Sequence, residues 1–63
     1  MITQLKKERF LRGIKQIDLM KETGIYHTRI SLIENGYCKP NPEEKLKLAK
    51  ALRMPIEQLF PRE

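Results

Sequence analysis

The sequence predicts an all-α protein, a compact bundle of five short helices that forms a single domain over residues 1–63. Apolar residues recur at spacings of three and four, which is the period of amphipathic helices, and no stretch alternates convincingly as a half-buried strand would. Glycines and prolines divide the chain into segments of helical length, with no linker, repeat or low-complexity tract. A chain of 63 residues hides only about 60% of its unfolded surface, so its core must be small.

The first two helices are predicted over about residues 2–12 and 16–23. The first ends before Gly13 and the second before Gly24, because glycine commonly follows the end of a helix. At roughly 100° per residue, one side of the second helix is expected to face the core. That side carries Leu19, Met20 and Thr23.

The third helix is predicted over about residues 27–35 and ends at Asn35-Gly36. Ile30 and Ile33 are three residues apart and are expected to point inward, which turns the polar residues outward. Two short helices joined at a glycine are the sequence form of a helix-turn-helix, whose second helix is offered to the major groove of DNA. The motif is therefore predicted over about residues 16–35.

The fourth helix is predicted to begin after Asn41, whose side chain can accept a hydrogen bond from an N–H group of the first turn. Pro42 suits the first helical position, and Glu44 lies where the acid of a capping box belongs. A short fifth helix is predicted after Pro55. Its apolar residues are Ile56, Leu59 and Phe60.

The predicted core consists mainly of aliphatic side chains, to which Phe10 and Phe60 add two aromatic rings. Residues 37–40 are expected to form the loop before the fourth helix. The apolar surface of that helix is predicted to carry Leu46, Leu48, Ala49, Ala51 and Leu52.

The composition excludes several classes of protein. No apolar run approaches the roughly 18 residues needed to span a bilayer, and the first residues lack the order of a signal peptide. Cys38 is the single cysteine, so no internal disulfide is possible, and a bystander thiol is favoured over a redox switch. We therefore expect a cytoplasmic protein that makes no membrane contact.

Catalysis and metal binding are not expected. One histidine, one cysteine and scattered carboxylates form no nucleophile–base pair and no ligand cluster of recognisable spacing. No glycine-rich phosphate loop occurs. We therefore predict no enzyme activity, metal, cofactor or small-molecule ligand.

The chain is basic, with 13 Lys and Arg against 8 Asp and Glu and a formal net charge of +5. The excess is uneven, because residues 1–39 hold eight basic and four acidic side chains whereas residues 40–63 hold five and four. A positive field around the predicted motif suits phosphate binding, since each neutralised phosphate releases counterions. A lysine-rich solvated surface would have the same composition, so charge alone leaves nucleic-acid binding open.

Four pieces of the sequence, in order and in register, resemble the lambda-repressor-like, Cro/XRE-type helix-turn-helix family over about Leu5 to Phe60. They are Gln16 with Leu19 and Gly24, the run Ile30-Ser31-Leu32-Ile33-Glu34-Asn35-Gly36, Pro40 followed by Leu46-Lys47-Leu48-Ala49-Lys50-Ala51-Leu52, and Leu59-Phe60. The second piece looks like the family signature I-S-x-I/L-E-N-G. The resemblance implies a five-helix bundle of the lambda-repressor-like type that binds operator DNA, usually as a dimer.

The resemblance implies base-reading side chains at the start and along the outward side of the third helix. The residues at these positions are His27, Thr28, Ser31 and Leu32. His27 and Thr28 can hydrogen-bond a base edge, whereas Leu32 can only meet a thymine methyl group. The alternatives are that His27 is a solvent-facing polar residue and that Leu32 packs sideways on a neighbouring loop.

Backbone phosphates are expected to meet residues beside the presumed groove. Gln16 begins the second helix, whose free N–H groups and partial positive charge suit an anion, although plain helix capping is the alternative. Lys15, Arg29, Asn35 and Lys39 flank the groove and are expected to bind phosphates without reading sequence. Any one of the lysines can equally be merely solvated.

The resemblance further implies an ion pair between Arg9 and Glu34, which would tie the first helix to the end of the third. Such a pair, if half-buried, would cost more to break than the ~0–1 kcal/mol of an exposed pair. The chain also departs from the family pattern. Lys15 and Tyr26 replace the usual Ser or Thr caps, which predicts weakly capped helices, and Arg53 replaces a glycine, so either that turn differs or Arg53 adopts a strained backbone.

One module of this size reads only a few base pairs, so a homodimer on a pseudo-palindromic operator is expected. Its contact is predicted to use part of the last helix or the residue beside it. The candidates are Met54, Ile56, Leu59 and Phe60. The alternative is a monomer in which all four cap the core.

The predicted function is that of a sequence-specific double-stranded DNA-binding transcription regulator, expected to be a repressor, with residues 27–35 in the major groove. The alternative from another class is an antitoxin-like or partner-binding interaction module of the same fold, and a third is non-specific nucleic-acid binding. DNA binding through several phosphates must weaken steeply with salt, whereas an apolar protein interface should not.

Overall fold

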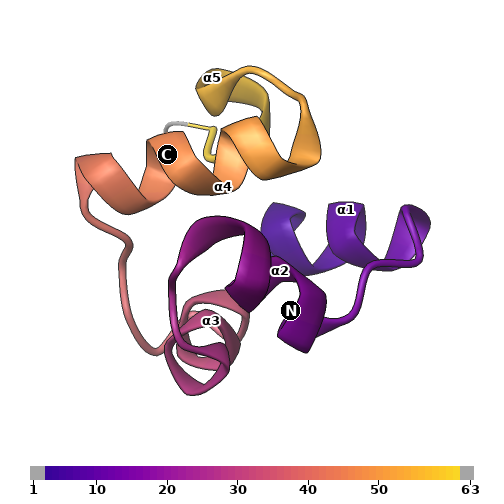
Figure 1. Cartoon of the computed structure of the whole chain (residues 1–63). Coiled ribbons are helices and arrows are strands. Elements are labelled where there is room, and N and C mark those ends of the chain that lie inside the picture. Colours follow the sequence, from indigo (N-terminus) through magenta and orange to yellow (C-terminus); the bar gives the residue numbers. More distant parts are fainter. Residues whose placement is uncertain (1–2, 62–63) are drawn as a thin grey trace.

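A computed structural model describes residues 3–61 and contains five helices (Figure 1). They are α1 (Gln4–Leu11), α2 (Gln16–Thr23), α3 (His27–Glu34), α4 (Pro42–Leu52) and α5 (Ile56–Leu59). Every regular element among the described residues is a helix, so the all-α prediction is confirmed. Thr3 precedes α1 as its N-cap, and the predicted start at Ile2 lies outside the described residues.

Local hydrogen bonds explain where the helices begin. Asn41 and Glu44 form the predicted capping box, in which Oδ1 of Asn41 accepts from the Glu44 N–H at 2.7 Å and Oε1 of Glu44 accepts from the Asn41 N–H at 3.0 Å. The side chains of Lys15 and Tyr26 make no cap hydrogen bond at the starts of α2 and α3. The weak capping predicted for α3 is therefore confirmed, whereas α2 has half of a capping box, because Oδ2 of Asp18 accepts the Lys15 N–H at 3.4 Å.

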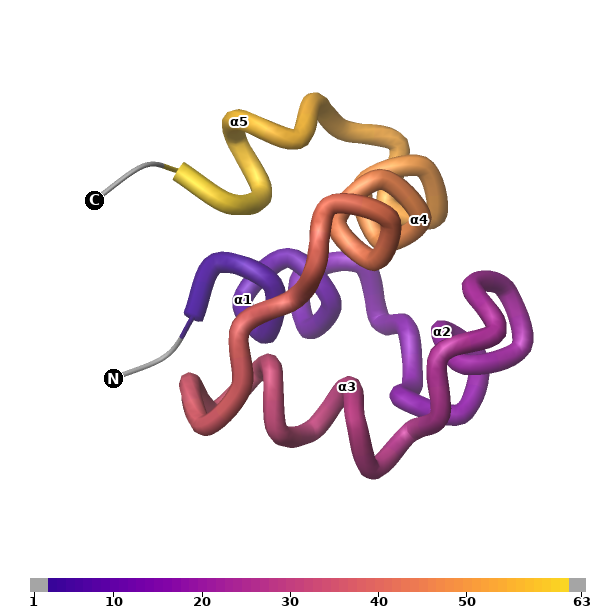
Figure 2. Tube along the Cα trace, turned by 90° about the vertical axis from the view of Figure 1, so that its left-hand side faces the viewer, coloured from indigo at the N-terminus to yellow at the C-terminus, as the bar shows by residue number. Residues whose placement is uncertain are grey.

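The helices pack so that α3 lies at one edge of the bundle. α2 contacts α3 and α4, while α1 contacts α3 and α5, and α5 also packs on α4. In both views of the backbone α3 lies on the side of the molecule away from α5 (Figures 1 and 2). One long side of α3 is thus left without a neighbouring helix.

The core lies where the five helices converge. Its buried apolar residues are Leu5, Leu19, Ile25, Ile30, Ile33, Leu48, Ala49, Leu52 and Leu59. Two expectations for the core were wrong. Phe10 is 61% exposed because its ring lies on the surface of α1 against the guanidinium of Arg9, 4.8 Å from the ring centroid. Leu46 is 51% exposed because it lines an open groove between α4 and α5.

Of the two alternatives for the end of α4, a different turn or a strained backbone at Arg53, the structure has the second. The residue has φ 56° and ψ 47°, which is the left-handed region that side chains with a Cβ avoid. Its N–H donates to the Lys50 carbonyl oxygen at 3.1 Å, and the next N–H, of Met54, donates to that of Ala49 at 3.0 Å. The helix therefore ends as it would at a glycine, and Arg53 carries the strain.

Candidate nucleic-acid interface

The turn between α2 and α3 sets the angle of the two helices. Gly24 ends α2 with φ 78°, and its N–H donates to the Met20 carbonyl oxygen at 2.7 Å. The hydroxyl of the buried Thr23 donates to the Leu19 carbonyl oxygen at 2.7 Å and accepts the Ile25 N–H at 3.1 Å. The turn is thus closed by internal hydrogen bonds.

α3 is divided into a buried and an outward side. Ile30 and Ile33 are buried, as predicted, and are joined on this side by the carboxylate of Glu34. The outward side carries four of the predicted site residues. His27, Thr28 and Asn35 are exposed, and Leu32 remains 40% exposed. The structure therefore brings polar side chains and one apolar side chain together on an open helix face.

Two rings lie side by side at the start of α3. Tyr26 is 64% exposed, and the centroid of its ring is 4.7 Å from that of His27 at an interplanar angle of 30°. These values fall within the range of stacked aromatic pairs. The sequence prediction treated Tyr26 only as a missing cap and did not include it in the site.

A buried polar cluster holds α3 against α1 and α2. Nε and Nη2 of Arg9 donate to the two carboxylate oxygens of Glu34 at 2.5 and 3.2 Å, and Nη1 donates to the Ile14 carbonyl oxygen at 2.9 Å. Gln16 adds a third hydrogen bond to this carboxylate, from Nε2 to Oε1 of Glu34 at 3.0 Å. Thr3 Oγ1 donates to the Glu34 carbonyl oxygen at 2.7 Å. Because these bonds compensate the buried charges, the cluster holds the C-terminal end of α3 in place.

Arg29 pairs with Glu44, which the sequence predicted only as the acid of the α4 capping box. Nε and Nη2 of Arg29 donate to the two carboxylate oxygens of Glu44 at 3.0 and 2.9 Å. The Arg29 hydrogen bond, followed by that of the Asn41 backbone N–H, holds the pKa of Glu44 below its usual range. Arg29 is thus paired with Glu44, which links α3 to α4, and its contact with a DNA phosphate stays a prediction.

Asn35, which follows the last residue of α3, contacts Ser31 in the preceding turn. Nδ2 of Asn35 donates to the Ser31 carbonyl oxygen at 2.8 Å and lies 3.4 Å from its Oγ. Ser31 is half-buried, whereas Asn35 is exposed. Of the predicted base-reading residues, Ser31 is thus the most covered.

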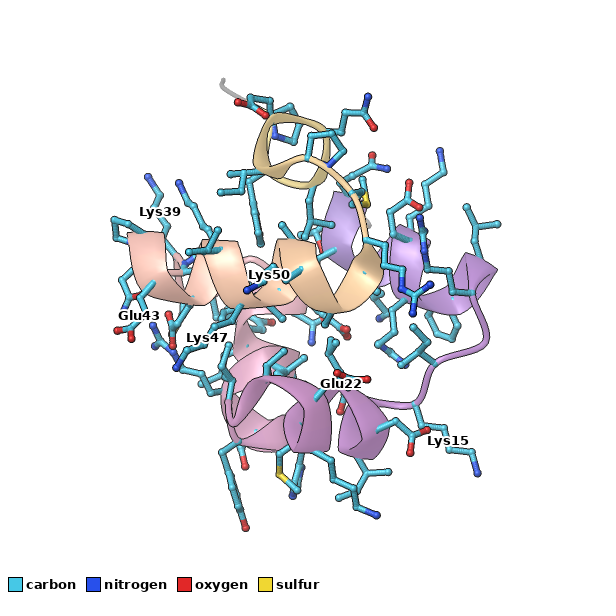
Figure 3. All side chains as sticks on the ribbon, turned by 45° about the horizontal axis from the view of Figure 1, so that its top comes forward. Lys15, Glu22, Lys39, Glu43, Lys47 and Lys50 are labelled. Atoms are coloured by element: carbon cyan, nitrogen blue, oxygen red, sulfur yellow. The ribbon has the colours of Figure 1, made fainter. Side chains whose placement is uncertain are left out.

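Lys15 and Lys39 lie far apart, Lys15 beside the start of α2 and Lys39 near the start of α4 (Figure 3). Lys15 precedes α2 and Lys39 belongs to the loop before α4, and both side chains are exposed. Gln16, next to Lys15, is half-buried because it reaches in to Glu34.

The candidate dimer residues differ in burial. Leu59 is 1% exposed and belongs to the core, so it is not available to a partner, and the prediction for this residue was wrong. Met54, Ile56 and Phe60 are half-buried and pack against the core from outside. Met54 and Ile56 line an open groove of about 530 Å³. The other lining residues are Leu46, Ala49, Lys50, Arg53 and Pro55.

Within residues 3–61, no three His, Cys, Asp or Glu side chains are grouped so that they could hold a metal ion. None of the helices in this part of the chain is both long and apolar enough to cross a membrane. Cys38 is half-buried beside the core.

The comparisons agree with the geometry of α2 and α3. A family model described as Helix-turn-helix matches residues 5–59, which cover the five helices except for Gln4, the first residue of α1. A comparison with curated protein sequences gives no significant match.

Proposed function

The chain belongs to the lambda-repressor-like, Cro/C1-type helix-turn-helix family of DNA-binding regulators, and we propose that it recognises a specific double-stranded operator with α3. A cytoplasmic location is proposed together with this role. Occupation of the operator excludes other proteins from it, which is why repression is the role proposed. The proposed domain is the whole chain, residues 1–63.

The observation that carries the proposal is the outward side of α3. His27 and Thr28 stand at its first two positions, and Leu32 follows about one turn later, all exposed. Hydrogen-bonding groups beside an apolar group match the base edges and thymine methyl groups of the major groove. Ser31, which is half-buried under Asn35, is proposed as a minor contributor.

Phosphate contacts are proposed on both flanks of α3. Lys15 and Gln16 would meet one strand at the start of α2, where free N–H groups favour an anion. Asn35 and Lys39 would meet the backbone near the other end of α3. Nε2 of Gln16 already donates one hydrogen to Glu34, which leaves its second hydrogen for a phosphate oxygen.

A homodimer on a pseudo-palindromic operator completes the proposal. Met54, Ile56 and Phe60 are the half-buried apolar residues at the end of the chain proposed for the dimer contact. The half-sites would be about 10–10.5 base pairs apart, centre to centre. Analytical ultracentrifugation with and without operator tests this, and one copy that occupies a half-site of a full palindrome with undiminished affinity contradicts it.

An interaction module of antitoxin type is the second candidate, favoured by the exposed Leu32 and by the open groove beside Met54 and Ile56. Selection of bound fragments from random duplex DNA distinguishes the two functions. A regulator enriches one sequence and loses affinity steeply as salt rises. Failure to enrich any duplex contradicts operator recognition.

A further inference from the structure

The residue before α3 is a tyrosine that contributes no cap. Tyr26 has the extended backbone of an N-cap, but its side chain makes no hydrogen bond to the first turn. Ser, Thr, Asp or Asn at this position would satisfy one of the free N–H groups and stabilise the helix. The contribution of Tyr26 must therefore come from its ring, which is 64% exposed.

The ring of Tyr26 restricts the neighbouring imidazole. The two centroids are 4.7 Å apart and the planes are inclined by 30°, so the phenol ring lies against the imidazole in a tilted stack. An imidazole donates and accepts hydrogen bonds only through its two nitrogens, which lie at the ring edge. Stacking on a face therefore leaves both nitrogens accessible while it limits rotation of the His27 side chain.

We infer that Tyr26 is a positioning residue for base recognition, which holds the His27 imidazole edge-on to the major groove and so sharpens the preference at one base pair. This inference rests on the proposed function, because it names how one of its base-reading residues is oriented. A side chain held in its bound orientation loses less conformational entropy on binding, and the saving applies only where the base pair matches that orientation. Loss of Tyr26 is therefore expected to reduce discrimination between operators that differ at one base pair, and to leave the affinity for random DNA unchanged.

The test compares binding of the full chain to its selected operator, to operators changed at single base pairs, and to random duplex DNA. Tyr26→Ser should reduce discrimination at one base pair by roughly five- to tenfold, within the range of a single base contact, while affinity for random DNA stays unchanged. The same variant gains a cap, so its melting temperature should rise by roughly 4–8 °C. Tyr26→Phe keeps the ring and should retain the discrimination of the wild type.

A double-mutant cycle shows whether Tyr26 acts through His27. In a His27→Ala background, Tyr26→Ser should have no further effect on discrimination, because there is no imidazole to orient. Tyr37→Ser is the matched control, since Tyr37 is 79% exposed and has no stacked ring among the described residues. It should leave discrimination unchanged.

The outcomes separate this inference from the proposed function. A wild-type chain that prefers no duplex overturns operator recognition and the inference together. A wild-type chain that discriminates, with a Tyr26→Ser variant that discriminates equally, overturns the inference alone. Equal losses for Tyr26→Ser with and without His27 also overturn it, because Tyr26 would then contact DNA directly, and loss of discrimination in Tyr26→Phe would assign the effect to the hydroxyl.

Discussion

Nε2 of Gln16 lies 3.0 Å from Oε1 of Glu34 and donates a hydrogen bond to it. Gln16 is the first residue of α2, and Glu34 is the last residue of α3. The bond therefore joins the start of α2 to the end of α3. Glu34 also binds Arg9 of α1. Gln16, which is proposed to meet a phosphate, is therefore hydrogen-bonded to the same carboxylate that anchors α3.

Loss of the Glu34 charge should remove a large part of the free energy of unfolding. Glu34→Gln leaves the buried guanidinium of Arg9 without a counter-charge, which costs about 3–5 kcal/mol. The total stability expected for this length is roughly 3–9 kcal/mol. Urea denaturation measures the loss. Glu43→Gln is the control, because Glu43 forms only an exposed pair with Lys47 at 3.7 Å and should cost about 0–1 kcal/mol. Equal losses would show that the buried cluster stabilises no more than a surface pair.

Leu32 should read a base and not the DNA backbone. If its side chain meets a thymine methyl group, Leu32→Ala should weaken operator binding by about 1–3 kcal/mol and leave binding to random DNA nearly unchanged. Fluorescence anisotropy with both duplexes measures the difference. Leu11→Ala is the control, because Leu11 is also an exposed leucine but lies at the end of α1, outside the proposed DNA and dimer contacts. A uniform loss on both duplexes contradicts base reading by Leu32.

Lys39→Ala and Arg29→Ala should change the salt dependence of DNA binding by different amounts. Lys39→Ala removes a proposed phosphate contact and should reduce the slope of log K against log salt by about one. Arg29→Ala should change the slope less, because the charge of Arg29 is already balanced by Glu44. Titrations at several salt concentrations compare the two variants. A full unit of change for Arg29→Ala would show that its guanidinium leaves Glu44 for a phosphate.

Acid should weaken the contact between α3 and α4. The pKa of Glu44 is held below its ordinary value of 4.5, chiefly by the Arg29 hydrogen bond. Because the carboxylate is more acidic in the folded chain than in the unfolded chain, its stabilisation is complete above that ordinary value and is lost as the pH falls through the lower, folded value. The melting temperature should therefore drop below about pH 4.5. Glu44→Gln should show a smaller drop over this range, and identical pH profiles would contradict the assignment.

Arg53→Gly should stabilise the fold. Arg53 has φ 56°, a conformation that costs a residue with a Cβ about 1–2 kcal/mol and costs glycine nothing. The greater entropy of glycine in the unfolded chain offsets part of the gain, so a net increase of about 0.5–1 kcal/mol is expected. Thermal unfolding measures it. Lys50→Gly, inside α4, is the control and should lower stability by about 1 kcal/mol. A destabilised Arg53→Gly variant would mean that the arginine side chain makes a contact that outweighs the strain.

The helices themselves were predictable from the sequence. The cap of α4 lies within four consecutive residues, and Gly24 ends α2 through its own backbone freedom, so no distant contact is needed to form either boundary. The inward sides of α2 and α3 were predictable for a similar reason, because Leu19, Ile30 and Ile33 follow the helical period. These features are local, and local features can be derived from neighbouring residues.

The contacts between helices were decided only by the tertiary structure. Leu46 and Leu59 are both leucines at apolar positions of predicted helices, yet Leu59 is buried where α5 packs on the bundle and Leu46 stays exposed on the open side of α4. Arg29 and Glu44 are fifteen residues apart, and only the packing of α3 near the start of α4 brings their charges together. Helical periodicity determines which residues share a side of a helix, but burial and pairing depend on what that side meets after folding.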